Sequence, residues 1–414
     1  MLGFLHSVCT IFAAEKQIIG MKKCFFLGLL GILTQFALSQ VPLNDAAYIS
    51  LLTSSPCEEE VFTVYGHAAL RVHDPVQKLD YVFNYGIFDF EQPHFIYRFA
   101  KGETDYRLGV ANYSDYVIEY QLRGSTITEQ RLNLTPAERQ CLWEALVENY
   151  RPENRVYRYN FFFDNCATRP AALIEKVVGQ VDYHYPYTAQ TFRSLINHCT
   201  RNHAWLTFGC DLALGSPTDS RATAHEMMFL PDYLREAFAK AEVIDEQGKR
   251  RPLVIETHVI EAGEPDEPEK DFWDLLSPMR LGWLTFALTY VITALGRYQK
   301  RAYKGFDILL FGLAGLAGCV LFFLAFFSVH PCTWPNYLLL WLHPFHLLGM
   351  ILFCINSAQK AAYYYHFINF AALTLLFAGW VFLPQQLNSA FIPLAASLWL
   401  RSAGGIYRKK WTTE

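Results

Sequence analysis

Five predominantly apolar stretches dominate the last third of the chain. They cover residues 278–295, 306–329, 337–355, 366–383 and 389–400. The first four approach the roughly 20 residues that a membrane-spanning helix needs, whereas the fifth is short and contains Pro393. This pattern predicts an all-α transmembrane bundle of about five helices over residues 275–414.

Lysine and arginine occur only in alternate connections of this bundle. Loops 296–305 and 356–365 and the tail after residue 400 carry them, whereas loops 330–336 and 384–388 carry none. Because positive loops stay on the cytoplasmic side, the first helix is expected to enter from outside and the C-terminus to be cytoplasmic. Residues 40–275 then lie outside the cytoplasm.

The N-terminus independently predicts export. A Met-Lys-Lys start at residues 21–23 precedes the apolar run 25–36 and small residues up to Ser39, after which we expect cleavage. Residues 1–39 are therefore interpreted as an upstream segment and a signal peptide, and an uncleaved anchor is the alternative. The acidic, proline-containing segment 263–274 is expected to link the exported domain, residues 40–262, to the transmembrane domain.

The exported domain has the mixed pattern of an α+β fold. Alternating or continuous apolar runs predict strands, and 3.6-residue periodicity predicts helices. The expected strands are 62–72, 80–88, 116–122 and 130–134; the expected helices are 136–149, 171–178, 191–197 and 231–241.

Charge is distributed unevenly along the chain and limits the function classes. Only six of the 74 charged residues fall within 281–400, so the chain is neither a purely soluble enzyme nor a disordered or fibrous protein. Segment 41–280 carries a net charge of −13, which argues against nucleic acid as a partner.

The exported domain has five cysteines, an odd number, so at least one stays unpaired. Cys199 and Cys210 are candidates for a disulfide, and Cys141 is expected to be a buried structural thiol. No CxxC motif and no His/Cys spacing typical of zinc is present, so neither a metal nor an organic cofactor is expected.

A polar face is predicted on one hairpin. With a turn at 74–77, Arg71 would pair with Asp80 and His67 with Asn84, while the opposite face is apolar. An opposite-charge pair across the strands supports this register. A solvated face is the simplest explanation, but Asn84 in this position would also orient the His67 ring.

Cys166 lies just before a predicted helix. Pro170 is tolerated only in the first helical turn, which places Cys166 at or before the helix start. Backbone N–H groups and the helix dipole there, with Arg169 nearby, favour the thiolate. A structural thiol is the alternative, but Cys166, His67 and Asn84 form a nucleophile, base and orienter set. The N–H of Cys166 would contribute to an oxyanion hole.

These segments resemble a known family. The blocks at 65–72 (YGHAALRV), 83–90 (FNYGIFDF) and 164–169 (DNCATR), with lesser ones at 191–193 and 229–231, resemble the bacterial Lnb-type lipoprotein N-acyltransferases over roughly residues 43–400. Their periplasmic domain is similar to circularly permuted papain-like (NlpC/P60-like) domains, in which the His strand precedes the Cys helix. The resemblance implies Cys166 as nucleophile and His67 as base, whereas Asn84 as the third group rests on the hairpin register.

The resemblance also implies the reaction and the location. An acyl chain would pass from a membrane phospholipid to Cys166 as a thioester, and then to the α-amine of the diacylglyceryl-Cys at a lipoprotein N-terminus. The protein would be a multi-pass inner-membrane enzyme with its catalytic domain in the periplasm. The expected substrate-binding residues are polar groups near the thiol or in the membrane domain: Arg71, Asn165, Arg169, Arg280, His343 and His346.

Three other function classes remain open at this point. A peptidoglycan peptidase or amidase would use the same Cys and His, but it needs only one membrane anchor. A thiol phospholipase or thioesterase would use water as the acceptor. A non-catalytic membrane receptor or binding module would contain Cys166 as a structural thiol.

Overall fold

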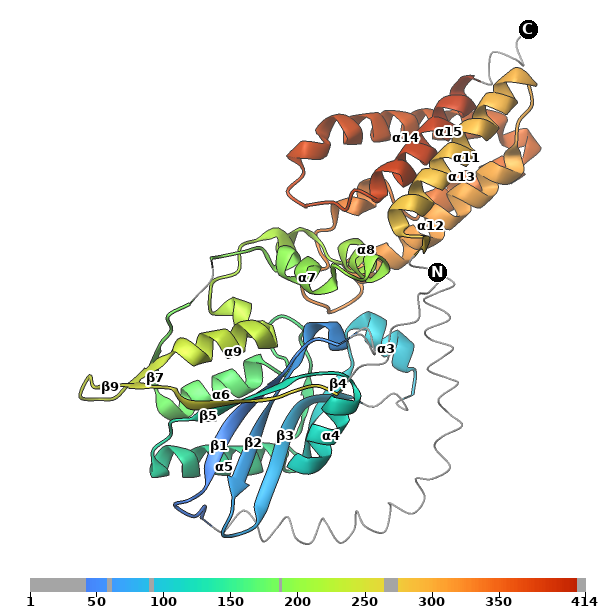
Figure 1. Cartoon of the computed structure of the whole chain (residues 1–414). Helices are drawn as coiled ribbons and strands as arrows, with labels where there is room; N and C mark the ends of the chain where they lie inside the picture. The colour runs from blue at the N-terminus through green and yellow to red at the C-terminus, as the bar shows by residue number, and fades with distance from the viewer. Residues whose placement is uncertain (1–41, 58–61, 89–92, 186–187, 264–274, 408–414) are drawn as a thin grey trace.

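The computed structural model describes residues 42–57, 62–88, 93–185, 188–263 and 275–407. It has two parts, a mixed α/β domain and a C-terminal helical bundle (Figure 1). The expected signal peptide and all of the expected linker except Gly263 lie outside the described residues.

The α/β domain is built on a seven-stranded antiparallel sheet with the order β10-β5-β1-β2-β3-β4-β6. Its strands are β1 (Tyr48–Ser54), β2 (His67–Asp74), β3 (Leu79–Phe88), β4 (Asp105–Asn112), β5 (Ile127–Leu132), β6 (Val156–Arg158) and β10 (Val254–Ile260). A small second sheet contains β7 (Gln180–Asp182), β8 (Glu242–Ile244) and β9 (Arg250–Pro252).

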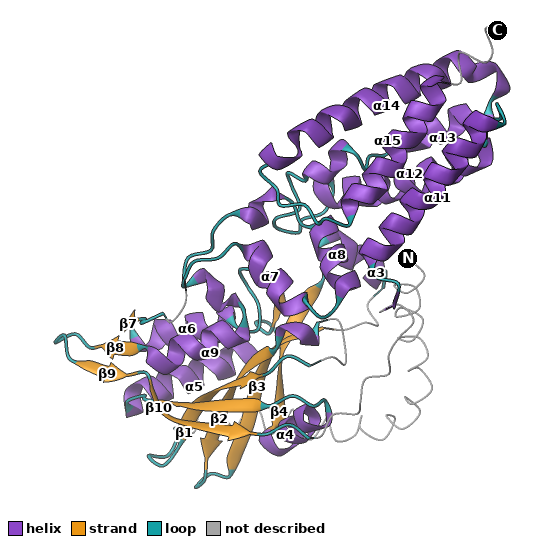
Figure 2. Cartoon of the chain, turned by 45° about the horizontal axis from the view of Figure 1, so that its top comes forward, coloured by secondary structure: helices purple, strands orange, loops and turns teal. Residues whose placement is uncertain are grey.

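Helices cover both faces of the large sheet (Figure 2). The helices α5 (Pro136–Tyr150), α6 (Thr168–Val178) and α9 (Pro231–Lys240) pack on one face. Their core contains Leu70, Phe83, Leu142, Ile174 and Phe238, all buried. The predictions of helices at 136–149, 171–178 and 231–241 are confirmed, and that at 191–197 corresponds to α7 (Phe192–Thr200).

The predicted strand 116–122 is wrong, because this segment is part of helix α4 (Tyr113–Leu122). Tyr116 and Tyr120, four residues apart, share one helix face and pack with Ala69 and Val82 on the second face of the sheet. The expectation of a solvated face on the β2–β3 hairpin is therefore also wrong. Aromatic and β-branched residues gave this helix a strand-like composition.

The register of the β2–β3 hairpin differs from the predicted one by two residues. Arg71 is opposite Val82, and His73 is opposite Asp80, because four residues separate Asp74 from Leu79. A shift of two residues leaves every side chain on its predicted face. Arg71 still reaches Asp80 diagonally, with 2.7 Å between Nε and Oδ1.

The bundle contains α11 (Pro278–Tyr298), α12 (Lys304–Phe326), α13 (His346–Cys354), α14 (Gln359–Gly379) and α15 (Phe391–Tyr407). Among the described residues, three helical segments are long and apolar enough to cross a membrane: Pro278–Tyr298, Lys304–Phe326 and Asn356–Phe382. The third predicted stretch is not one continuous helix. It forms a 3-10 turn, η6 (Tyr337–Leu340), a break that includes Pro344, and the nine-residue α13.

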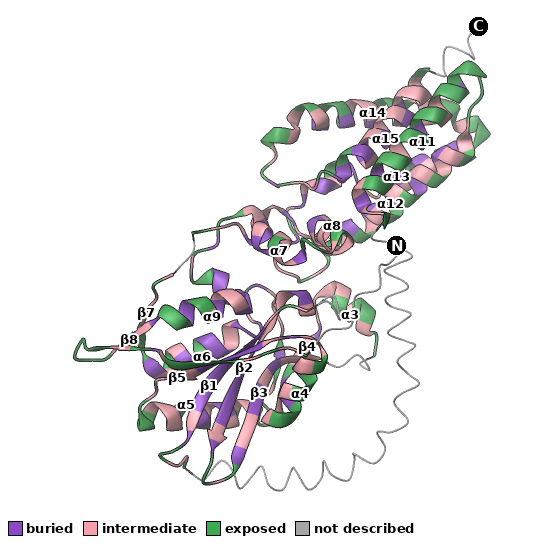
Figure 3. Ribbon diagram, in the orientation of Figure 1, coloured by how far each residue is buried: buried purple, intermediate pink, exposed green. Residues whose placement is uncertain are grey.

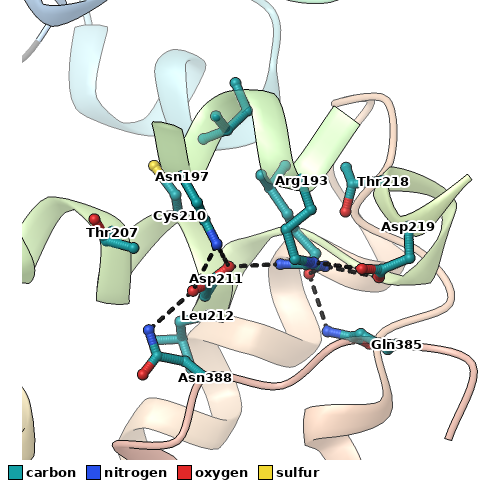
Figure 4. A network of polar contacts seen from close by, with 12 residues as sticks. Arg193, Asn197, Thr207, Cys210, Asp211, Leu212, Thr218, Asp219, Gln385 and Asn388 are labelled. Carbon is teal, nitrogen blue, oxygen red and sulfur yellow. Dashed lines mark hydrogen bonds and ion pairs between the residues drawn. The ribbon is translucent and has the colours of Figure 1, made fainter. Parts of the chain in front are cut away.

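The helices α7 and α8 (Ala204–Ala213) lie between the sheet and the bundle (Figure 1). Arg193 on α7 is fully buried and donates to Asp211 at 2.9 Å and to Asp219 at 2.9 Å (Figure 4). Asp211 also accepts from Nδ2 of Asn388, in the loop before α15, at 2.9 Å. Gln385 donates across the same junction to the Leu214 carbonyl at 3.0 Å. A buried polar network thus joins the two parts.

Candidate active site

Asn165 shapes the turn that presents Cys166. Its side-chain oxygen accepts from the N–H groups of Ala167 and Thr168 at 2.8 and 2.9 Å, so it fixes the turn that leads into α6. Its Nδ2 donates to the Phe161 and Phe229 carbonyls, each at 2.8 Å. All of the polar side-chain atoms of buried Asn165 therefore have hydrogen-bond partners within the protein. Cys166 lies two residues before the first residue of α6, as the position of Pro170 predicted.

His67 is the first residue of β2, and its ring contacts Asn84 on β3. The distance between His67 Nε2 and Asn84 Oδ1 is 2.6 Å. In the observed register Asn84 lies diagonal to His67 and not directly opposite, as the sequence had predicted. Since Nε2 donates to the Asn84 carbonyl oxygen, Nδ1 is the ring nitrogen left to face the thiol.

Gly86 lies beside both the thiol and the imidazole. It interrupts the β3–β4 ladder at a bulge and has a φ of +98°. A Cβ built there would lie 3.7 Å from Cys166 Cβ and 4.0 Å from His67 Cε1. Cys166 and His67, 99 positions apart in the sequence, both border Gly86 and lie close enough for each to shift the pKa of the other.

The two groups shift each other's pKa in opposite directions. Burial alone would raise the pKa of the Cys166 thiol, but the adjacent His67 and the N–H groups of Ala68 and Cys166 outweigh burial and lower it. Burial would lower the pKa of His67, but the Cys166 charge and the Asn84 contact raise it. Both directions favour a thiolate–imidazolium pair, which is the reactive form of a cysteine nucleophile.

Tyrosines that the sequence reasoning missed surround this pair. The Tyr120 ring stacks on the His67 ring, with 6.1 Å between centroids, and Tyr116 shares a hydrogen bond of 3.0 Å with Ser54. On the other side Tyr159 lies 3.8 Å from the position of a Gly86 Cβ and stacks on Tyr106 at 4.2 Å. The i, i+4 spacing of Tyr116 and Tyr120 was the available signal, and it was interpreted as a strand.

Two of the other candidate residues near the thiol make ion pairs within the protein. Arg71 is buried, donates to Asp80 and Glu129, and lies 3.4 Å from the centre of the Tyr113 ring. Arg169 donates to both oxygens of Asp164 at 2.5 and 2.8 Å. These contacts hold the β2–α4 face and the Cys166 loop.

The remaining candidates lie in the helical bundle. Arg280 is exposed near the start of α11 and donates to the Leu275 carbonyl at 2.6 Å. His346 is buried and contacts Tyr365 Oη at 2.6 Å and the Trp341 carbonyl at 2.7 Å. His343 stacks on it, with 4.1 Å between centroids. No recorded contact among the described residues joins these three to Cys166.

The suggested Cys199–Cys210 disulfide is absent, because both residues are free thiols. Cys199 is on α7 and Cys210 is on α8, and both pack in an apolar cluster with Phe162 and Phe229. Cys210 Sγ lies 3.6 Å from Tyr65 Oη, two residues before His67. The thiol therefore contributes to the packing between α8 and the start of β2.

A folded domain with a buried cysteine beside a half-buried histidine, joined to apolar helices, defines a membrane protein with a thiol site outside its helical bundle. The family models agree with this class. The model of the Lnb N-terminal periplasmic domain matches residues 35–198, and that of the Lnb transmembrane domain matches residues 268–410. The chain belongs to the Lnb-type proteins, and it is a membrane protein with a periplasmic N-terminal domain.

Comparisons with the curated proteins and with the solved structures found no match. Neither family model covers residues 199–267, the segment that includes α8 and Asp211. This segment nevertheless makes the main polar contacts between the two matched parts.

Proposed function

We propose that this chain is a lipoprotein N-acyltransferase with Cys166 as its nucleophile. The observation that carries the proposal is the convergence of Cys166, His67 and Asn84 in an Lnb-type chain. His67 is the general base, and Asn84 is a positioning residue that holds the imidazole through Nε2.

The first half-reaction is attack on a phospholipid ester. The Cys166 thiolate adds to the carbonyl carbon, and the N–H groups that face the sulfur, of Ala68 and Cys166, stabilise the developing oxyanion. The ester C–O bond then breaks, and the lysophospholipid oxygen takes the proton from His67. An acyl thioester on Cys166 remains.

The second half-reaction forms an amide. The free α-amine at the N-terminus of a diacylglyceryl-Cys lipoprotein attacks the thioester carbonyl and gives its proton to His67. The C–S bond breaks and the thiolate returns. A thioester suits this route because it reacts readily with amines.

The position of the site supports membrane-embedded substrates. His67 begins β2 at the end of the sheet where Tyr65 contacts α8, and α8 in turn contacts the outer loops of the bundle. We place the bundle in the inner membrane with a cytoplasmic C-terminus, and residues 1–39 as a segment that is removed. Arg280, exposed near the start of α11, is assigned a contact with a lipid phosphate.

Intact-mass spectrometry of the full-length protein incubated with phospholipid vesicles tests this proposal. The wild type should gain a hydroxylamine-sensitive acyl mass that Cys166→Ser lacks and His67→Ala forms much more slowly. Cys141→Ser is the matched control, because Cys141 is an exposed thiol on α5 and not the buried thiol that the sequence predicted. A diacylglyceryl-Cys peptide should discharge the thioester as an N-acyl product.

The other outcomes separate the alternatives. A thioester that water discharges, with no N-acyl product, identifies a thiol phospholipase. Absence of an acyl mass combined with cleavage of peptidoglycan fragments identifies an amidase. If Cys166→Ser behaves like the wild type in both assays, the thiol is structural and the acyltransferase proposal fails.

A further inference from the structure

The short helix α3 (Phe95–Lys101) exposes apolar side chains although it belongs to the folded domain. Ile96, Tyr97 and Phe99 are 66%, 55% and 50% exposed. Its two basic side chains form ion pairs with carboxylates of the same domain. Arg98 donates to Asp105, and Lys101 pairs with Glu103. Such an apolar surface on a water-facing helix has no explanation in the fold itself and marks an interaction site.

The contacts of α3 place it at the level of the membrane surface. The Lys101 carbonyl accepts from the Val329 N–H at 2.8 Å, and the Phe99 carbonyl contacts His330 Nε2 at 2.7 Å. The Tyr97 ring lies 6.1 Å from that of Phe323, three residues before the end of the α12 span. Three residues of helix rise about 5 Å, so Tyr97 lies at the depth where interfacial tyrosines gather.

Other exposed rings occur at the same end of α12. Phe326, Phe327 and Trp334 are 49%, 60% and 54% exposed, and Phe326 packs on Trp334 with 4.6 Å between centroids. Figure 3 shows α3 in the exposed and intermediate colours, at the end of the sheet nearest the bundle, and none of its residues is buried. The surface of α3 therefore continues the apolar belt of the bundle, which identifies lipid as its partner.

A row of aromatic rings connects α3 to the nucleophile. Phe95 stacks on Phe88 at 6.3 Å, Phe88 contacts Tyr106 at 5.1 Å, and Tyr106 stacks on Tyr159 at 4.2 Å. Tyr159 borders the Gly86 position beside Cys166. All four residues of this row are half-buried.

We propose that α3 is seated in the outer leaflet of the membrane and that the row Phe95–Phe88–Tyr106–Tyr159 guides an acyl chain of a phospholipid to Cys166. The first part rests on the position of α3 alone. The second part rests on the proposed acyl transfer. The chemistry recognised is hydrocarbon at the interface, since the row offers apolar ring surface and no free charge.

Photo-crosslinking of the full-length protein in vesicles of phosphatidylethanolamine and phosphatidylglycerol tests the first part. Benzoylphenylalanine replaces Ile96 in one sample and Val76 in the control, which is 63% exposed at the opposite end of β2. Mass spectrometry should find a phospholipid adduct at position 96 and none at position 76. Equal labelling at both positions, or an adduct between two copies of the chain at position 96, overturns the proposal.

Donor selectivity tests the second part. Thioester formation is measured with vesicle phospholipid and with a water-soluble butyryl ester, and the ratio of the two rates is compared. Ile96→Asp should lower this ratio roughly tenfold, the factor that corresponds to one lost apolar side-chain contact, and Val76→Asp should not change it. Phe88→Ser should lower it as well.

An unchanged ratio in both Ile96→Asp and Phe88→Ser refutes the acyl path. If the wild type forms no thioester with either donor, the proposed acyl transfer fails. The crosslinking result still tests the position of α3, because it does not depend on acyl transfer.

Discussion

The low pKa of the Cys166 thiol depends on His67, and His67→Ala should reverse it. The thiol is buried, and burial raises its pKa, so the imidazole is the main group that lowers it. An ordinary cysteine with a pKa of about 8.5 is about 1% thiolate at pH 6.5. The wild-type thiolate fraction should exceed this value, and the fraction in the variant should fall below it. Because an adjacent opposite charge lowers the pKa of an acid by about 1–3 units, alkylation at pH 6.5 should slow by about tenfold or more.

The assay is pulsed iodoacetamide labelling of the vesicle-reconstituted protein between pH 5 and pH 10, read by peptide mass spectrometry. Because the folded-state pKa of Cys166 is lowered, its reactivity should persist below the usual cysteine range and disappear only as the pH falls through the lowered value. The raised pKa of His67 keeps the imidazolium present over the lower part of this range. Exposed Cys141 supplies an internal reference in the same sample.

Two results would refute this reasoning. One is a wild-type profile for Cys166 that coincides with that of Cys141. The other is a His67→Ala profile that coincides with the wild type, because the thiol would then titrate independently of the imidazole. Asn84→Ala should give a smaller alkaline displacement than His67→Ala, since it removes only the hydrogen bond that supports His67.

Three further substitutions probe the supports of the site. Asn165→Ala leaves two carbonyls and two N–H groups without their partner and should destabilise the domain by about 2–4 kcal/mol, read as a lower thermal midpoint with slower Cys166 labelling. Asp211→Ala removes one of the two carboxylates that pair with buried Arg193 and should lower the free energy of unfolding by about 3–5 kcal/mol. Asn388→Ala removes only a hydrogen bond to Asp211 and should lower it by about 1 kcal/mol. Equal thermal shifts in the two variants would contradict this difference. Arg401→Met removes the ion pair between Arg401 and buried Asp307 and should lower the melting temperature of the detergent-solubilised protein, and the double variant with Asp307→Leu should recover most of the loss.

The two-residue alternation of side chains along a strand made the faces of the β2–β3 hairpin predictable from the sequence. His67 and Arg71 alternate with Ala68 and Leu70 at the period of a strand, and this period survives any register shift by an even number. The loop length, by contrast, set the exact pairing. Lys78 adopts a φ of +57°, and Asp74 accepts from the N–H groups of Val76 and Gln77, so the loop holds four residues. These are local details that the pattern does not encode.

Long-range partners explain what the sequence could not reveal. β1 lies between β2 and β5, and β10 pairs with β5 from more than 120 residues away, although none of β1, β4 or β10 was predicted. Helix α4 has the composition of a strand, and only its packing on Ala69 and Val82 makes the helix the stable choice. The contacts of Asn165 in the Cys166 turn likewise include the Phe229 carbonyl, 64 positions later.

The contacts of the bundle bear on its topology independently of charge. The two loops without Lys or Arg, 330–336 and 384–388, are those that bond to the folded domain, through Asn336, Gln385 and Asn388. At the other end, Lys304 donates to Asn356 at 2.8 Å, so the two basic loops also lie together. The chain must therefore pass from one end of the bundle to the other between residues 336 and 356, although α13, the helix in this segment, has only nine residues.

The 3-10 turn η6 and the break around Pro344 supply the remaining length of this passage. Buried His346 satisfies the Trp341 carbonyl exposed by the break, which is the condition for irregular backbone inside a bilayer. Arg297 lies 4.7 Å from the centre of the Tyr407 ring, so α15 ends beside the first basic loop. Successive segments of the bundle therefore run in alternating directions. This alternation supports placing the C-terminus on the side of the membrane opposite Cys166, as the distribution of positive charge predicts.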